Sequence, residues 1–453
     1  MFQKVVVANR GAVAARVIAA LRTLGIASVA VYSEADRDLP YLAMADESYA
    51  IGPAAPAASY LNQDALLDVV RRSGADGLHP GYGFLSEHPA FAARVIEAGC
   101  GFIGPSPKWL EAMGHKTQAR QLMANYGMPM GASSGILSDN WEERLAAARA
   151  IGFPVLVKPA TGGGGIGMLP AHSEEELAAA LERAASLANR SFGNAALYLE
   201  RLLLKPRHIE FQVLADRYGA VRHLFERDCS VQRRHQKVIE ESPAPSIDRV
   251  DLAATADRIT GILAELGYDN IGTVETLYDP NAGFAFLEMN TRLQVEHAVT
   301  EEVTGIDLVQ SQIRLAAGER LDQVLPADIA PRGHAIEVRI YAEDPKRFLP
   351  SPGPLRVFRP PSGEGIRVET GYAEGNNVTP FYDPMLAKLI THGATRREAI
   401  ARMQEALDRF AVEGVKTNIP FARQVLADEA FMAGAIHTGL AADVLARPTI
   451  QQS

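Results

Sequence analysis

Hydrophobic residues in the first hundred positions follow two alternating spacings. Short apolar or β-branched runs predict strands at residues 5–8, 28–32, 77–79 and 102–103. Apolar residues three or four positions apart predict helices between them, at residues 12–24, 62–73 and 89–98. This rhythm is typical of a parallel α/β sheet wound with helices. Ligands of such sheets bind beyond the carboxyl ends of the strands, which here are residues 9–11 and 79–87.

The pattern changes in the second part of the chain. We expect a helix at 116–126, strands at 154–158, 197–200 and 208–213, and a helix at 174–187. A helix from about residue 253 precedes two strands, 272–278 and 284–290, which residues 279–283 join as a hairpin. Beyond about residue 330, β-rich and Pro/Gly-rich sequence followed by two helices predicts a third, α+β unit.

Composition and charge narrow the possible classes of protein. A length of 453 residues with 47% hydrophobic and 22% charged residues is ordinary for a globular protein of about three domains. The net charge of -9 argues against a nucleic-acid or acidic-membrane surface. Only two cysteines, Cys100 and Cys229, are present, which favours reduced thiols. No leader pattern precedes the first strand and no apolar run is long enough for a membrane span, so we expect a cytoplasmic protein.

Residues 286–297 combine acids, amides and a cation in one short segment. Ordinary packing requires no such set. In extended backbone alternate side chains share a face, and the polar ones here are Glu288, Asn290, Arg292, Gln294 and Glu296. We therefore expect a strand followed by an extended loop at an active site, with Glu296 beside the Arg292 guanidinium. In the alternative, helical interpretation, Arg292 and Glu296 would form only a surface ion pair.

The predicted hairpin suggests a metal site. Pairing the strands about residues 281 and 282 places Glu275 opposite Glu288, with Asn290 on the same face. Two carboxylates and an amide oxygen are hard ligands that suit Mg²⁺ or Mn²⁺ held against nucleotide phosphates. The alternative is an exposed hairpin, but directly opposed like charges are destabilising without a cation between them.

A glycine-rich loop at residues 162–167 indicates phosphate binding. No Lys and Ser or Thr follow its last glycine, so it is not a P-loop, and no Gly-x-Gly-x-x-Gly follows the first strand. Lys158 precedes the loop on a predicted strand, and Lys116 is a second candidate cation. A glycine loop that covers the phosphates as a lid explains why the lysine precedes the loop. Glycines alone would indicate only a flexible loop.

Residues 226–237 hold a dense set of donors and predict an anion site. Extended alternation would place Arg233, His235 and Lys237 on one face, and Gln232, Arg234 and Gln236 on the other. A solvated charged face is the simpler alternative for part of this run. His208 lies in a strand of alternating polar and apolar residues, and by itself it would be interpreted as a buried core histidine rather than as a ligand.

Together these residues resemble biotin carboxylase, the ATP-grasp component of biotin-dependent carboxylases. The resemblance runs from residue 5 to about residue 445 and is most specific at residues 8–11, 79–87, 226–237 and 288–297. It implies an α/β fold in which an N-terminal Rossmann-like domain, residues 1–113, precedes an ATP-grasp domain, residues 114–325. It further implies a mobile lid at about 131–203 and a C-terminal α+β domain at 330–445.

The resemblance also implies a role for each site residue. ATP would contact Lys116, Lys158, Gly163, Gly164, Gly165, Glu200, Arg201, Leu203, His208, Gln232 and His235. Glu275, Glu288 and Asn290 would hold Mg²⁺ or Mn²⁺. Bicarbonate would lie among Lys237, Arg292, Gln294, Val295 and Glu296, and biotin would meet Tyr82 and Arg339. Glu296 would act as general base, with Arg292, Lys237 and Arg339 as the other catalytic groups.

The implied reaction is ATP-dependent carboxylation of biotin by bicarbonate through carboxyphosphate. The chain contains no Met-Lys-Met tripeptide, the family's biotin attachment mark, so we expect a separate biotin carboxyl carrier protein and separate carboxyltransferase subunits. A homodimer within an acyl-CoA carboxylase, with acetyl-CoA as the first candidate, is the expected assembly. A urea, pyruvate or other biotin-dependent carboxylase is the alternative.

Three positions depart from the family pattern. Ile166 stands where the glycine loop commonly has arginine, Ala298 replaces a usual proline, and Arg201 replaces a common lysine. None of these substitutions removes an expected metal ligand or the expected base.

Two competing hypotheses about function remain. One is another bicarbonate-using ATP-grasp ligase, which forms carbamoyl phosphate or acts on purine precursors. The other is a nucleotide-binding paralogue that regulates a carboxylase, which Ile166 alone favours.

Overall fold

The computed structural model describes residues 1–160, 167–234 and 236–447. The N-terminal unit is a parallel sheet in the order β3-β2-β1-β4-β5. Its strands are β1 (Lys4–Val7), β2 (Ala27–Tyr32), β3 (Glu47–Ala50), β4 (Gly77–His79) and β5 (Gly101–Phe102). Its helices are α1 (Gly11–Thr23), α2 (Gln63–Ser73), α3 (Pro89–Glu97) and α4 (Pro107–Gly114). The predicted parallel α/β unit is confirmed, with the addition of β3.

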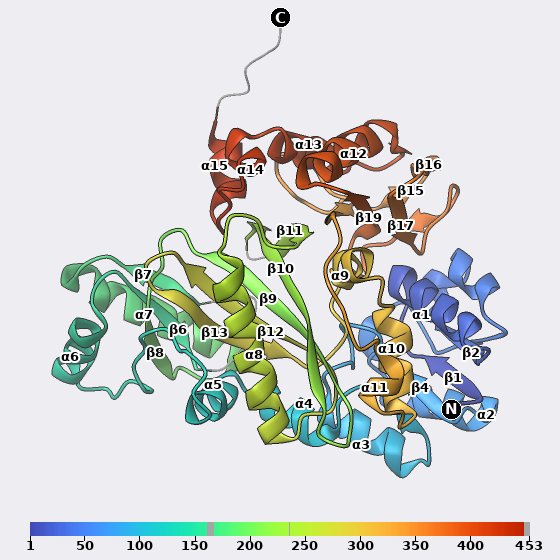
Figure 1. The fold of residues 1–453 in the computed structure, drawn as a ribbon, viewed down its shortest axis with the longest axis horizontal. Helices are drawn as coiled ribbons and strands as arrows, with labels where there is room; N and C mark the ends of the chain where they lie inside the picture. The colour runs from blue at the N-terminus through green and yellow to red at the C-terminus, as the bar shows by residue number, and fades with distance from the viewer. Residues whose placement is uncertain (161–166, 235, 448–453) are drawn as a thin grey trace, which may run out of the picture.

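A small unit with its own core follows helix α5 (Lys116–Asn125). Its three-stranded antiparallel sheet has the order β7-β6-β8, from β6 (Val155–Pro159), β7 (Leu169–Ala171) and β8 (Leu197–Arg201). Two helices, α6 (Trp141–Ile151) and α7 (Glu174–Phe192), pack on this sheet. Figure 1 shows α6, α7 and the sheet projecting from one side of the molecule.

An eight-stranded sheet forms the centre of the molecule, in the order β13-β12-β9-β10-β11-β14-β19-β17 (Figure 1). Its first five strands are β9 (Arg207–Ala215), β10 (Val221–Arg233), β11 (Gln236–Ser242), β12 (Asn270–Asp279) and β13 (Gly283–Asn290). Strands β14 (His334–Tyr341), β17 (Ile366–Thr370) and β19 (Met385–Gly393) extend it. Because β11 pairs with β14, the sheet continues without a break across residue 330.

Helices and short strands surround this sheet. In its middle part these are α8 (Arg249–Leu266), α9 (His297–Thr304), α10 (Leu308–Ala316) and α11 (Leu321–Val324). Short strands β15 (Gly353–Pro354), β16 (Val357–Arg359), β18 (Asn377–Val378) and β20 (Ala411–Glu413) form two small ladders. The expectation of two C-terminal helices is wrong. Four are described: α12 (Arg396–Arg409), α13 (Ile419–Leu426), α14 (Glu429–Met432) and α15 (Leu440–Ala446).

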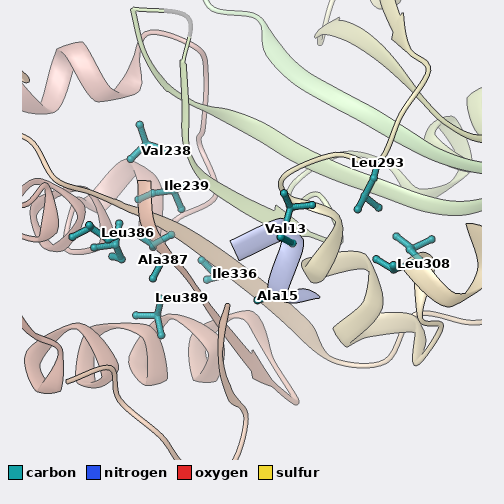
Figure 2. Close-up of a cluster of buried hydrophobic side chains, with 14 of the residues drawn as sticks. Val13, Ala15, Val238, Ile239, Leu293, Leu308, Ile336, Leu386, Ala387 and Leu389 are labelled. Carbon is teal, nitrogen blue, oxygen red and sulfur yellow. The ribbon is translucent and has the colours of Figure 1, made fainter. Parts of the chain in front are cut away.

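The largest hydrophobic core joins the N-terminal helix α1 to the C-terminal strands. Figure 2 shows Val13 and Ala15 of α1 in the same cluster as Ile336 of β14 and Leu389 of β19. The backbones also approach closely, because a Cβ placed on Gly371 would lie 2.3 Å from the Cα of Gly11. The loops after β1 and β4 are therefore held in a fixed position relative to β14. No helix among the described residues is long and apolar enough to cross a membrane.

The burial of β9 leads to a prediction about stability. Replacing Leu214, which is fully buried in the largest core, with alanine should destabilise the chain by about 2–5 kcal/mol, because the removed methyl groups leave a cavity. The same change at Leu349, which is 57% exposed, should stay within about 0.5 kcal/mol of the unaltered chain. Urea unfolding followed by circular dichroism measures both, and equal effects would contradict this view of the core.

Candidate active site

One cavity of about 850 Å³ lies where the three parts of the chain meet. The loops after β1 and β4 form one wall, β6 and β8 of the small unit form another, and the central sheet forms its floor. Residues expected at the site that line it are Tyr82, Lys116, Lys158, Glu200, His208, Gln232, Lys237, Glu275, Glu288, Asn290, Arg292, Gln294, Val295, Glu296 and Arg339. Segments far apart in sequence thus converge on one space.

Residues 288–296 form a strand and a loop, so the helical alternative is wrong for this segment. The predicted extended form does not hold throughout, because Val295 and Glu296 form a turn, with a φ of -80° and a ψ of 15° at Glu296. Strand β13 ends at Asn290, a loop follows, and α9 begins at His297. The Arg292 guanidinium donates to Oδ1 of Asn290 at 3.0 Å and to Oε1 of Gln294 at 2.9 Å. The alternate polar side chains therefore lie side by side and face the cavity.

Glu296 lies at the end of this segment and is fully buried. Lys237 donates to its Oε1 at 2.7 Å, and Arg339 donates to its Oε2 at 2.9 Å. Burial by itself would raise the pKa of Glu296, but Lys237 and then Arg339 outweigh this effect and hold that pKa well below its usual range. Glu296 is consequently an ionised carboxylate at neutral pH.

The guanidinium that contacts Glu296 belongs to Arg339, whereas Arg292 was expected beside it. Arg292 instead donates from Nε to Oε2 of Glu87 at 2.9 Å. Glu87 lies in the loop after β4, so this ion pair joins the N-terminal unit to the segment after β13. Arg292 and Glu296 still line the same cavity, and Arg292 presents its charge there without being bound to the carboxylate.

Glu275 and Glu288 are direct cross-strand partners on β12 and β13, as the hairpin predicts. The turn is centred on residue 281, half a residue before the predicted midpoint of 281 and 282. A β-bulge between Glu275 and Thr276 shifts the pairing by one residue and so places Glu275 opposite Glu288. Asn290 donates to Glu275 at 2.7 Å, while Lys116 pairs with Glu288 at 2.6 Å. The carboxylate and amide oxygens fit Mg²⁺ or Mn²⁺, because both ions prefer hard oxygen ligands. Glu275, Glu288 and Asn290 would hold the ion.

Several of the residues expected to contact ATP line the cavity. Lys158 on β6 pairs with Glu200 on β8, and Arg120 contacts the same carboxylate at 3.2 Å. Gln232 contacts His208 at 2.9 Å between their side-chain nitrogens. Arg201 and Leu203 are not among the lining residues of the cavity, and Arg201 donates to the carbonyl of Ile151 at 3.0 Å. Gly163, Gly164, Gly165, Ile166 and His235 lie outside the described residues.

The predicted continuous strand over residues 226–237 is wrong. Strands β10 and β11 form a hairpin, and Arg234 near its tip has a φ of 50°, the left-handed conformation of a tight turn. Gln232 and Lys237 are cross-strand partners across it and both line the cavity. Extended alternation predicts opposite faces for these two residues, because it assumes that the chain does not turn between them.

Several buried polar residues at the site were not singled out from the sequence. Glu210 of β9 is fully buried and accepts from Lys237 at 2.6 Å, and its other oxygen binds Arg227 at 2.5 Å. The Cys229 sulfur lies 3.9 Å from Glu296. A signal for Glu210 existed, since polar residues alternate with apolar ones at residues 208–213 and it lies between His208 and Gln212.

Asn9 lies in the segment 9–11 that is expected beside the ligand, although the sequence assigns it no role, and it shapes the loop that carries Tyr82. Its side-chain amide donates to the carbonyl oxygens of Pro80 at 2.7 Å and Tyr82 at 2.8 Å. Gly81 has a φ of 66°, and a Cβ there would lie 2.8 Å from the Asn9 amide nitrogen. The loop is therefore fixed against the end of β1, with Tyr82 in the cavity.

Comparison with known proteins identifies the family. Residues 1–110 match the model described as the biotin carboxylase N-terminal domain, and residues 337–443 match its C-terminal domain. Residues 115–324 match the ATP-binding domain of the carbamoyl-phosphate synthase L chain. The chain belongs to the biotin carboxylase family. It is an ATP-dependent ligase with the ATP-grasp fold, and the two flanking matches separate it from the carbamoyl-phosphate-forming alternative.

Individual relatives are similar over nearly their whole length. The biotin carboxylase of Halalkalibacterium halodurans is 49% identical, over 96% of each chain. A pyruvate carboxylase subunit of Methanothermobacter thermautotrophicus is 47% identical, over 97% of this chain and 89% of the relative. The biotin carboxylase domain of Hydrogenobacter thermophilus 2-oxoglutarate carboxylase, a dimer in complex with MgADP and bicarbonate, is 42% identical with a TM-score of 0.92 over 99% of each chain. The Campylobacter jejuni biotin carboxylase with an ATP analogue has a TM-score of 0.93 at 40% identity, over 98% of this chain and 99% of that one.

The opposed carboxylates lead to a prediction about metal binding. Glu288→Gln should weaken binding of Mn²⁺ in the presence of ATP by about tenfold or more, because one anionic ligand becomes neutral. Electron paramagnetic resonance of free Mn²⁺ measures this without any turnover. Glu265→Gln, a matched change at an exposed position on α8, should leave the affinity unaltered, and an unaltered affinity in both variants would exclude Glu288 as a ligand.

Proposed function

We propose that the chain carboxylates biotin with ATP and bicarbonate, through carboxyphosphate. The observation that carries this proposal is the buried Glu296 carboxylate, held by Lys237 and Arg339 in a cavity that also contains the opposed Glu275 and Glu288 pair. A base, two cations and a metal-ligand set in one cavity are the groups that this reaction needs.

Glu296 is the general base in this mechanism. Bicarbonate is a weak nucleophile until it loses its proton, and an ionised carboxylate within hydrogen-bond distance accepts that proton. Lys237 and Arg292 line the same space and would bind the anion there. As their cations turn toward bicarbonate, Lys237 stabilises the Glu296 carboxylate less, so the pKa of Glu296 rises and it becomes a stronger base.

The deprotonated bicarbonate oxygen then attacks the γ-phosphorus of ATP, and ADP leaves. Lys116 and Lys158, which both line the cavity, would bind the phosphates. A bound Mg²⁺ or Mn²⁺ would neutralise phosphate charge during this transfer. Closure of the unit at residues 131–203 over the cavity would exclude water, which otherwise hydrolyses carboxyphosphate. That unit has its own core, which suits a rigid moving lid.

Carboxyphosphate would break into CO₂ and phosphate, and the phosphate would take the ureido proton of biotin. The biotin nitrogen then attacks CO₂ and forms carboxybiotin. Arg339 would stabilise the enolate oxygen of the ureido group, and Tyr82 would contact the ring from the loop after β4. Both residues line the cavity and come from the two parts of the chain that share the largest core.

We further propose that biotin is carried by a separate carrier protein and that the chain is a homodimeric subunit of an acyl-CoA carboxylase, with acetyl-CoA as the first candidate. The match to a relative named biotin carboxylase over 96% of that relative's length supports the separate carrier. Relatives of almost equal similarity bear the names of a biotin carboxylase, of a pyruvate carboxylase component and of a biotin-dependent acyl-coenzyme A carboxylase component. The carboxyl acceptor therefore depends on the transferase with which the chain assembles.

Glu296→Gln should reduce biotin-dependent ADP release by about 10²–10⁴-fold, because an amide cannot accept the bicarbonate proton. Coupled measurement of ADP with free biotin, bicarbonate and ATP gives the rate. Equilibrium binding of an ATP analogue, which should be retained, shows that the variant is folded. Glu97→Gln, at an exposed position on α3, is the matched control. A variant at position 296 with full activity would remove the proposed base.

Affinity capture of the tagged chain from its native cells, followed by mass spectrometry, should recover a biotinylated carrier and carboxyltransferase subunits. The identity of the transferase names the acceptor. Recovery of a pyruvate-specific or urea-specific transferase would replace the acyl-CoA assignment and leave the carboxylation of biotin intact.

A further inference from the structure

A pair of buried glutamates, one of which contacts Arg339, has no part in the mechanism above. Glu240 on β11 and Glu337 on β14 are direct cross-strand partners. Both side chains are fully buried. Two carboxylates in this position repel one another, and burial adds to the cost of their charges. The fold therefore requires a compensating group beside them.

The two glutamates have unequal access to cations. Arg339 donates from Nε to Oε1 of Glu240 at 2.7 Å, and its other arm donates to Glu296 at 2.9 Å. Neither oxygen of Glu337 has a hydrogen-bond partner among residues 1–160, 167–234 and 236–447. The ammonium of Lys388 is 3.7 Å from Glu337.

Lys388 is more strongly engaged elsewhere. Its ammonium lies 2.7 Å from Glu369 on β17 and donates to the carbonyl of Val295 at 2.6 Å. It is thus the counter-ion of Glu369 first. Burial raises the pKa of Glu337 to about 8, and the attraction of Lys388 does not cancel this effect. One proton on the pair, placed on Glu337, removes the repulsion.

Other charged and titratable groups surround the pair. Burial also raises the pKa of Glu240, to about 7, while Arg339 and Lys237 lower it and Glu296 raises it. Because Arg339 donates to Glu240 directly, the pKa of Glu240 stays below that of Glu337. Burial raises the pKa of Tyr82, in the loop after β4, well above its usual range, and the charges of Glu369 and Glu337 raise it further. These groups account for the charges that face Glu337 from β11, β17, β19 and the N-terminal unit.

We propose that Glu240 is a positioning residue that holds the Arg339 guanidinium between Glu296 and the biotin position, and that Glu337 carries a proton which leaves the charge on Glu240. This proposal rests on the proposed function and adds to it how Arg339 is oriented. Arg339 is bound at one end by the base and at the other by Glu240, so its remaining N–H groups have a fixed direction. A second negative charge at Glu337 would compete for the same guanidinium.

Two matched variants test the proposal. Glu240→Gln keeps an acceptor for Arg339 but removes the charge, so biotin-dependent ADP release should fall about tenfold, the effect of losing one charge-assisted hydrogen bond. Bicarbonate-dependent ADP release without biotin should fall less, because Arg339 acts on biotin. Glu337→Gln mimics the protonated acid and should keep the biotin-dependent rate at neutral pH. A loss as large in Glu337→Gln as in Glu240→Gln, or equal losses of both activities in Glu240→Gln, would overturn the proposal.

The pH profile gives a second readout. The folded-state pKa of Glu337 is raised from 4.5 to about 8. Its contribution to stability is therefore fully present below about pH 4.5 and is lost as the pH rises through about 8. In the unaltered chain the biotin-dependent rate should decline as Glu337 ionises, and Glu337→Gln should remove that decline and lose less thermal stability over the same range. Identical profiles in the two proteins would contradict a proton on Glu337.

Infrared spectroscopy at neutral pH tests the proton without activity. The carbonyl band of a protonated carboxylic acid should be present in the unaltered chain and in the exposed Glu265→Gln control, and should be lost in Glu337→Gln. A band that persists in Glu337→Gln would overturn the assignment. If the unaltered chain released no ADP in response to biotin, the proposed function would fail, and with it the role of Glu240, whereas this band would still decide where the proton lies.

Discussion

The ammonium group of Lys237 is the shared ion-pair partner of three carboxylates at the centre of the site. It contacts carboxylates from three parts of the chain: Glu210 on β9, Glu275 on β12 and Glu296 before α9. Burial would lower the pKa of Lys237, but these carboxylates raise it well above its usual range. Removing one partner from such a buried set leaves uncompensated charge, which typically costs about 3–5 kcal/mol. The geometry of the proposed base, metal ligands and anion site therefore depends on one cation.

Much of this arrangement follows from local pattern. The hairpin composition at residues 279–283 and the period-two alternation of residues 286–296 predict that Glu275 faces Glu288 and that Asn290, Arg292, Gln294 and Glu296 share a face, and the structure has both features. The N-terminal α/β rhythm is also confirmed. Strand β3 was missed because its sequence, Glu-Ser-Tyr-Ala, has little apolar character and its residues are only half buried or exposed.

The positions of several site residues could not be predicted from the sequence, because they depend on contacts between segments that are distant along the chain. The turn between β10 and β11 reverses the chain within a run of polar residues, so alternation placed Gln232 and Lys237 on opposite faces. The guanidinium at Glu296 is that of Arg339, 43 residues away in sequence. Nothing in the local sequence specifies that β14 pairs with β11, and this pairing brings Arg339 to Glu296 and Glu337 to Glu240. Tertiary pairing, rather than residue type, decides these assignments.

The core shared by α1 and the C-terminal strands also bears on how the chain can be divided. Gly371 packs against the start of α1, and Val13 and Ala15 lie among residues of β14 and β19. A fragment that begins after the N-terminal unit would expose this apolar surface to water and present it to other copies of the fragment. Dissection at the interdomain boundaries would therefore give pieces that aggregate. Co-expression of both pieces offers the route to a divided enzyme, because each covers the exposed face of the other.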